Sequence, residues 1–216
     1  MKKALIERSS KPVALWLLTG VAMIIIQVLL GGITRLTGSG LSITEWQPIM
    51  GALPPLNDKD WNIAFEKYKE IAQYKLLNSY FSLQDFKFIF FWEWLHRLWA
   101  RLIGVVFLLP FIIFLFQKRF RKGMVKPLVI LFLLGALQGL VGWIMVQSGL
   151  EDPDALYVSH YSLAIHFMLA MMLLCYVFWF ALDLLVPVKQ FFINKLKQHK
   201  QYFTPIFPNT NIIATI

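Results

Sequence analysis

Residues 88–116 read FIFFWEWLHRLWARLIGVVFLLPFIIFLF, a stretch long and apolar enough to cross a lipid bilayer. Four ionisable side chains interrupt it near its beginning: Glu93, His96, Arg97 and Arg101. At about 100° per residue they fall on one face of a helix, and the rest of the surface stays apolar. Because ionisable groups are costly in hydrocarbon, their presence in a spanning helix indicates a functional site.

The composition of the whole chain is that of a membrane protein. Of its 216 residues 58% are hydrophobic and 15% charged, whereas soluble domains carry about 25% charged residues. Four apolar runs are long enough to span a bilayer, at about 12–31, 88–117, 127–147 and 161–186. The sequence therefore predicts an all-α membrane protein with a bundle of four transmembrane helices, and its single cysteine, Cys175, excludes an intrachain disulfide.

The charges between the runs predict the orientation of the chain. Lys and Arg dominate the amino terminus, the 118–126 connection and residues 187–216, whereas the connection after the third run carries only acidic residues. By the positive-inside rule both termini are cytoplasmic, and the long 32–87 loop lies outside. The net charge of +9 is thus a topology signal, and we expect no nucleic-acid partner. We expect a domain of residues 1–186 in a bacterial cytoplasmic (inner) membrane, followed by a cytoplasmic tail, 187–216.

The outer loop begins with residues that favour turns and exposed backbone donors, TRLTGSGLS at 34–42. These donors could hold an anionic group, or the segment could be an ordinary turn with Arg35 at the lipid headgroups. Farther on, Trp61–Tyr74 is typical of a surface helix, and several aromatic rings suit the membrane interface: Trp61, Phe65, Tyr68 and Tyr80. A loop of this length is expected to cap something.

Proline and glycine mark the ends of the first run and one face of the third. Pro12 is expected at the start of the first helix, and Gly31-Gly32 at its end. In the third run, Gly135, Gly139 and Gly142 share a face, where small residues let helices approach closely. Gln138 beside them can hydrogen-bond to another helix.

Two histidines are expected at the same depth. His96 and His166 each lie twenty residues before the inner end of their span, which places both about 30 Å from the cytoplasmic side. Two imidazoles at one level near the outer face could bind one haem iron, or each could be a hydrogen-bonded residue of the bundle. If haem binds, Arg35, Arg97 and Arg101 could pair with its propionates.

Glu93 precedes His96 by three residues on the same face. It could form an ion pair with Arg97, four residues on. It could also move protons, or stabilise positive charge at a reacting carbon beside the imidazole. The spacing allows both interpretations.

Several motifs together resemble the haem A synthase family, in its cysteine-free mitochondrial and Gram-negative type. The similarity starts at residues 31–42, GGITRLTGSGLS, and continues in order through Glu45–Pro48, Pro54-Pro55, Phe86-Lys87, Glu93–Arg97, Gln138–Trp143, Met145–Leu150 and His166. The resemblance implies oxidation of a ring methyl of haem O to the formyl group of haem A. It also implies an eight-helix fold of two four-helix halves, with the substrate haem in the amino-terminal half. The family's essential Glu and two His correspond to Glu93, His96 and His166.

Two departures from the family pattern bear on function. Many relatives have Arg where this chain has Ser162, and the chain stops where the second half, which holds a haem b, is expected. The resemblance therefore implies a half-length enzyme that needs a second copy of itself or a separately encoded second half, and a haem O-producing enzyme as partner. The alternatives are a b-type cytochrome subunit that only passes electrons, and an inactive truncated fragment.

Overall fold

The computed structural model describes residues 2–45 and 50–185, with the side chains of 2–10 and 50 excepted. Within this part, four long helices are each long and apolar enough to cross a membrane: α1 (Lys2–Leu36), α3 (Leu83–Phe116), α4 (Val125–Leu150) and α5 (His160–Leu185). The described residues contain no strand. The predicted all-α architecture with four transmembrane helices is confirmed, while residue 186 and the predicted 187–216 tail lie outside the described residues.

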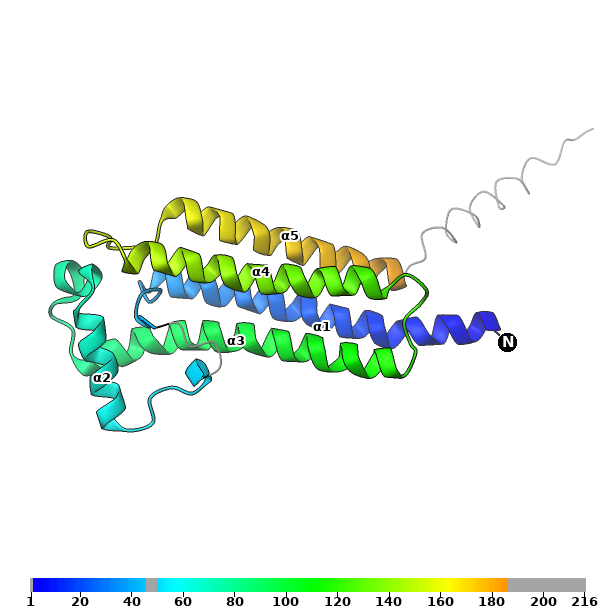
Figure 1. The fold of residues 1–216 in the computed structure, drawn as a ribbon, viewed down its shortest axis with the longest axis horizontal. Coiled ribbons are helices and arrows are strands. Elements are labelled where there is room, and N and C mark those ends of the chain that lie inside the picture. Colours follow the sequence, from blue (N-terminus) through cyan, green and yellow to red (C-terminus); the bar gives the residue numbers. More distant parts are fainter. Residues whose placement is uncertain (1, 46–49, 186–216) are drawn as a thin grey trace, which may run out of the picture.

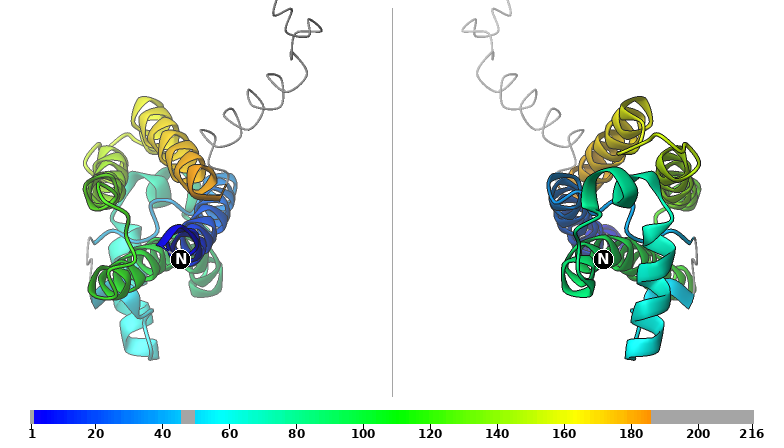
Figure 2. Two further views of the ribbon diagram at one scale, coloured as in Figure 1. Left: turned by 90° about the vertical axis from the view of Figure 1, so that its right-hand side faces the viewer. Right: turned by 90° about the vertical axis from the view of Figure 1, so that its left-hand side faces the viewer.

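The four helices form one up-and-down bundle (Figure 1). Seen along its axis, α1 lies between α3 and α5, and α4 lies on the opposite side (Figure 2). Consequently α3 and α5 are diagonal to each other and run in the same direction. We name the two ends of the bundle by what lies there. The basic end holds the start of α1 and the 117–124 connection, and the capped end holds residues 37–45, 50–82 and 151–159.

Helix α1 extends beyond the predicted 12–31 span at both ends, so two predictions were wrong. Pro12 lies inside the helix, because the helix continues into polar residues that an apolar run does not include. Gly31-Gly32 does not end it either. The end lies at Gly38, which has φ +66°, with hydrogen bonds from Ser39 N to Thr34 O (2.9 Å) and from Gly38 N to Arg35 O (3.3 Å). This pattern satisfies the last carbonyls of the helix and turns the chain back.

The capped end contains less loop than the predicted 32–87. Helix α2 (Asp58–Lys69) starts at the N-cap Asn57 and is followed by a short π-helix, Tyr74–Asn78. Helix α3 begins at Leu83 after a capping box formed by Ser82 and Asp85, which satisfies its first backbone N–H groups. The surface helix predicted at Trp61–Tyr74 therefore exists, but it lies several residues earlier.

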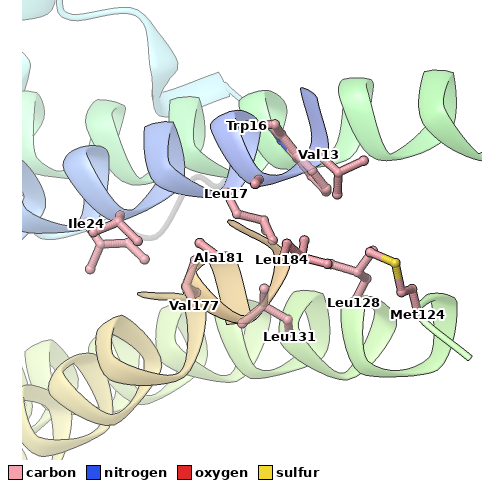
Figure 3. Packing of buried hydrophobic residues seen from close by; sticks show 12 residues of the cluster. Val13, Trp16, Leu17, Ile24, Met124, Leu128, Leu131, Val177, Ala181 and Leu184 are labelled. Carbon is pink, nitrogen blue, oxygen red and sulfur yellow. The ribbon is translucent and has the colours of Figure 1, made fainter. Parts of the chain in front are cut away.

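Two clusters of buried residues occupy opposite parts of the molecule. The one near the basic end joins α1, α4 and α5, as Figure 3 shows: Val13, Trp16, Leu17, Ile24, Met124, Leu128, Leu131, Val177, Ala181 and Leu184. The other, under α2, is Phe65, Tyr68, Phe86, Ile89 and Phe90. Phe65 and Tyr68 were expected at the membrane interface, but they belong to this cluster because α2 folds back over the start of α3.

Few residues of α3, α4 and α5 are buried between the two clusters. Among the described residues, none of 132–148 of α4 and none of 160–176 of α5 is fully buried, and α3 has no fully buried residue after Glu93. Both candidate histidines lie within these stretches.

Candidate functional site

His96 and His166 come from the two diagonal helices. His96 is on α3 and His166 on α5, and both are partly buried. Two imidazoles that approach from opposite sides of a bundle can act on one ligand between them.

Each histidine is held by a glutamine from the neighbouring helix. Nε2 of Gln27, on α1, lies 3.3 Å from Nδ1 and 3.2 Å from Nε2 of His96, and it donates to the backbone carbonyl of His96 at 3.2 Å. Nε2 of Gln138, on α4, lies 3.2 Å and 3.4 Å from the same two atoms of His166, and it donates to the His166 carbonyl at 2.9 Å. The two arrangements are alike atom by atom.

A glycine four residues after each glutamine makes room for the ring. A Cβ added to Gly31 would lie 3.1 Å from Cε1 of His96, and one added to Gly142 would lie 2.8 Å from Cε1 of His166. Both separations are shorter than an ordinary carbon–carbon contact of about 3.5–4.0 Å. The sequence pattern Gln-x3-Gly on α1 and α4 thus places one imidazole beside each of them.

The surroundings of the two rings fit a haem group. Three buried side-chain atoms here have no hydrogen-bond partner among the described residues: Oε1 of Gln27, Oε1 of Gln138, and Nε1 of Trp92, four residues before His96. Buried polar atoms are normally paired, so such a concentration indicates a polar ligand. A cavity of about 260 Å³ between α4 and α5 is bordered by Gln138 but by neither His96 nor His166. No group of three or more His, Cys, Asp or Glu that could hold a metal ion occurs in the described part, whereas a porphyrin needs only axial ligands.

Glu93 is buried and fully engaged. Its Oε2 accepts hydrogen bonds from Ser42 Oγ (2.7 Å) and from the backbone N of Ile43 (2.8 Å), and its Oε1 accepts one from Arg97 (2.5 Å). The ion pair with Arg97 is thus present. The 34–42 segment was open to two interpretations, an anion site or an ordinary turn; its last residue, Ser42, donates to the carboxylate of Glu93, as does Ile43 N just after it.

The three arginines are placed differently. Arg97 also donates to the carbonyls of Ile43 (3.1 Å) and Glu45 (3.4 Å), so it binds the chain after α1. Arg35 is exposed, and its guanidinium lies 4.9 Å from the ring centre of Tyr157. Arg101 is partly buried, five residues after His96. The structure therefore brings Glu93 and Arg97 together, and it separates Arg35 from them.

The connections at the capped end are tied to each other. Nε2 of Gln73 donates to the carbonyls of Gly38 (3.2 Å) and Leu156 (3.1 Å), and its Oε1 accepts from the hydroxyl of Tyr68 (3.1 Å). One buried side chain therefore joins the segments that follow α1, α2 and α4. This arrangement covers the bundle at the end nearer the histidines.

Sequence reasoning found some of these residues and missed others. The hydrogen bond predicted from Gln138 to another helix exists, and its partner is His166. Close packing was expected at three glycines of α4, but it occurs only at Gly142, because Gly135 and Gly139 face open space in the described part. Gln27 and Ser42 were missed. The repeated Gln-x3-Gly spacing was the available signal for Gln27.

The fold and the site define the protein first as a multi-pass helical membrane protein with a glutamine-bonded histidine on each of two diagonal helices. Its family follows from sequence comparison. The family model COX15-CtaA, described as cytochrome oxidase assembly protein, matches residues 14–208. The chain belongs to this family, and the matched region runs beyond Val186.

Relatives of known name support the same family. The chain is similar to the Heme A synthase of Rhodospirillum centenum, with 50% identity over 191 residues, 88% of this chain and 50% of the relative. It is 46% identical to that of Nitrosomonas eutropha over 189 residues, 88% of this chain and 52% of the relative. For that of Paramagnetospirillum magneticum the identity is 53% over 175 residues, 81% and 49% of the two chains. The chain thus spans about half the length of these relatives. No solved structure matches it.

Proposed function

We propose that this chain acts in haem A biosynthesis, as the part of a haem A synthase that binds haem O while its ring methyl is oxidised to a formyl group. The observation that carries the proposal is the pair His96 and His166, which approach from diagonal helices in a chain whose relatives are named Heme A synthase. Haem O, as substrate, supplies the iron and the methyl group.

Different residues of the chain are proposed to bind the iron and the propionates of haem O. His96 and His166 hold the iron from its two sides, and Gly31 and Gly142 allow the rings to sit close to α1 and α4. Arg35 and Arg101 are the arginines proposed for the propionates, and Arg97 contributes through its contacts with Glu93 and the following loop. The capped end keeps bulk water from the site.

We infer the orientation from the charges. Lys118, Arg119, Arg121 and Lys122 lie at the basic end, so this end faces the cytoplasm and both termini are inside. The haem site then lies near the outer face of a bacterial cytoplasmic (inner) membrane. A cysteine placed at Asp154, in the opposite loop, should react with an impermeant thiol reagent in intact spheroplasts. Labelling only after lysis would reverse the orientation.

Replacement of the histidines tests the binding proposal. His96→Ala and His166→Ala should each lower the haem content of the purified protein and change its reduced-minus-oxidised spectrum. His160→Ala is the matched control, because His160 is also a histidine of α5 but lies against Tyr161, with 4.1 Å between ring centres and 39° between the ring planes. Unchanged haem content in both site variants would refute the assignment.

Extraction and identification of the bound haem distinguish a haem A synthase from a b-type cytochrome subunit. From a host that makes haem O, the protein should yield haem O, its hydroxylated intermediate or haem A. Haem b alone would favour a b-type electron-transfer subunit instead. Haem O without any product would favour an inactive substrate-binding fragment.

Glu93 has two proposed roles that a pair of variants can separate. Ser42→Ala removes one donor to the carboxylate but keeps its charge, whereas Glu93→Gln removes the charge. If Glu93 only anchors the loop, the two variants should lower stability and conversion together. If it stabilises charge at the oxidised carbon, Glu93→Gln alone should reduce conversion by about 10² or more with haem O still bound.

A partner is proposed because the chain spans about half the length of its relatives. A second copy of this chain, or a separately encoded second half that carries a haem b, would complete an eight-helix unit. A separate enzyme that produces haem O would supply the substrate. Gly135 and Gly139 offer an open small-residue face on α4 for such a contact. The mass of the purified chain in detergent tests the homodimer, since a monomer that makes no haem A would contradict it.

A further inference from the structure

Gln27 and Gln138 are the polar side chains that α1 and α4 place against the histidines. Each uses its amide nitrogen on the same two targets, the backbone carbonyl of the histidine and the imidazole ring. The amide oxygen of each is buried and has no hydrogen-bond partner among the described residues. A buried acceptor without a donor is destabilising, so its occurrence at both positions calls for a physical explanation.

The chemistry of an iron-bound imidazole supplies a donor for this oxygen. When one ring nitrogen binds iron, the other carries a proton, and this N–H needs an acceptor that fixes the tautomer and the direction of the ring. The amide nitrogen cannot serve, because it is itself a donor. The amide oxygen is the acceptor attached to the same group.

The contacts with the glutamines do not fix which nitrogen of each imidazole faces the amide. Each amide nitrogen lies within 3.2–3.4 Å of both ring nitrogens, so neither nitrogen is preferred. The bond to the histidine's own carbonyl, at 3.2 Å for Gln27 and 2.9 Å for Gln138, keeps the amide beside the ring. A rotation of the imidazole or of the terminal amide would then bring a ring N–H to the amide oxygen.

We propose that Gln27 and Gln138 are matched positioning residues, whose Oε1 atoms accept the ring N–H of His96 and His166 while the opposite ring nitrogens face the iron. This assignment rests on the proposed function, since it requires haem between the two histidines. It goes beyond that function in giving each axial ligand its own partner, on α1 for one and on α4 for the other.

Two leucine variants and one control test the assignment. Gln27→Leu and Gln138→Leu keep the approximate size of the side chain and remove the acceptor. Thr19→Val is the control, because it removes a polar group of α1 whose hydroxyl bonds within its own helix, to the carbonyl of Leu15. Each purified protein is titrated with ferric haem b as the probe, and the midpoint potential of the bound haem is measured.

The expected results follow from the role of a ligand's hydrogen-bond partner. Each Leu variant should weaken haem binding by about 10- to 100-fold. It should also raise the midpoint potential, because an imidazole that has lost its acceptor is a weaker electron donor to ferric iron. Gln→Glu at either position restores an acceptor and, as the neutral acid, a donor to the carbonyl, so affinity should return to near that of the parent. Thr19→Val should match the parent in both measurements.

The outcomes separate this inference from the proposed function. Leu variants with parental affinity and potential would overturn the inference alone. Weaker binding with an unchanged potential and no recovery in Gln→Glu would mean a packing role, and would also overturn it. A parent chain that binds no haem would overturn the proposed function together with this assignment. Helical circular dichroism and elution volume in detergent identify any variant that fails to fold, and Gln→Glu then decides the outcome.

Discussion

Gly142→Ala is expected to damage the site without unfolding the bundle. The added Cβ would lie 2.8 Å from Cε1 of His166. An ordinary carbon–carbon contact is about 3.5–4.0 Å, so the ring must move by about 0.7 Å or more. The atom that has to yield belongs to a side-chain ring rather than to backbone, and the fold can therefore absorb the methyl group.

The displaced ring should bind haem less well. Functional groups must be held within about 0.5 Å of their working geometry, and a displacement of about 1 Å can cost 10²-fold. We expect haem affinity to fall by about 10- to 100-fold, measured by titration with ferric haem b and by the spectrum of the bound form. Gly31→Ala, with a 3.1 Å approach to His96, should show a smaller loss.

Gly139→Ala is the matched control on the same helix. Nothing lies within 4 Å of a Cβ at this position in the described part of the chain. The change should leave haem affinity unaltered and stabilise the helix by up to about 1 kcal/mol. Equal haem affinity in Gly142→Ala and Gly139→Ala would refute the reasoning about the close approach to His166.

Three further predictions concern stability. Lys118, the second residue after the end of α3, has φ 52°, a left-handed conformation that favours glycine. Lys118→Gly should therefore stabilise the protein by about 1 kcal/mol in denaturant titrations, and a loss of stability would contradict this. Burial raises the pKa of Tyr68 from 10.0 to about 12, so the neutral phenol contributes stability that is complete below pH 10 and is lost as pH rises through about 12. Tyr68→Phe should be less sensitive to pH between 10 and 12 in thermal unfolding, and an unchanged pH profile would argue against this contribution. Gln73→Leu leaves the carbonyls of Gly38 and Leu156 without their donor and should cost about 1–3 kcal/mol. Faster proteolysis of the capped end, with the membrane helices intact, is the expected sign, and parental resistance would count against it.

The sequence was sufficient to predict the four helices and that His96 and His166 lie on two of them, α3 and α5. Apolar runs long enough to span a bilayer leave few alternatives to helices, because backbone groups in lipid must bond internally. The depth of His96 and His166 followed from the helical rise alone. These features depend on local sequence, so no knowledge of the other helices was needed.

Other features depend on neighbours and could not be predicted from local patterns. Gly31-Gly32 looked like a helix end. Instead, the absence of a side chain at Gly31 lets the ring of His96, a residue far along the chain, lie close to α1. Phe65 and Tyr68 have the amphipathic character of interfacial residues, and only the fold of α2 over α3 buries them. Glu93 looked equally suited to an ion pair or to chemistry, and its bonds to Ser42 and Ile43 depend on the path of a loop.

The diagonal placement of α3 and α5 has a mechanical consequence. The helices that carry His96 and His166 are separated by α1 on one side and α4 on the other (Figure 2). A ligand coordinated by both histidines would connect α3 directly to α5 across the bundle, at a level where few side chains of α3, α4 and α5 are buried. Ligand binding would then stabilise the bundle against separation of its helices. The stabilisation is about 2.7 kcal/mol when the free ligand is at 100 times its Kd.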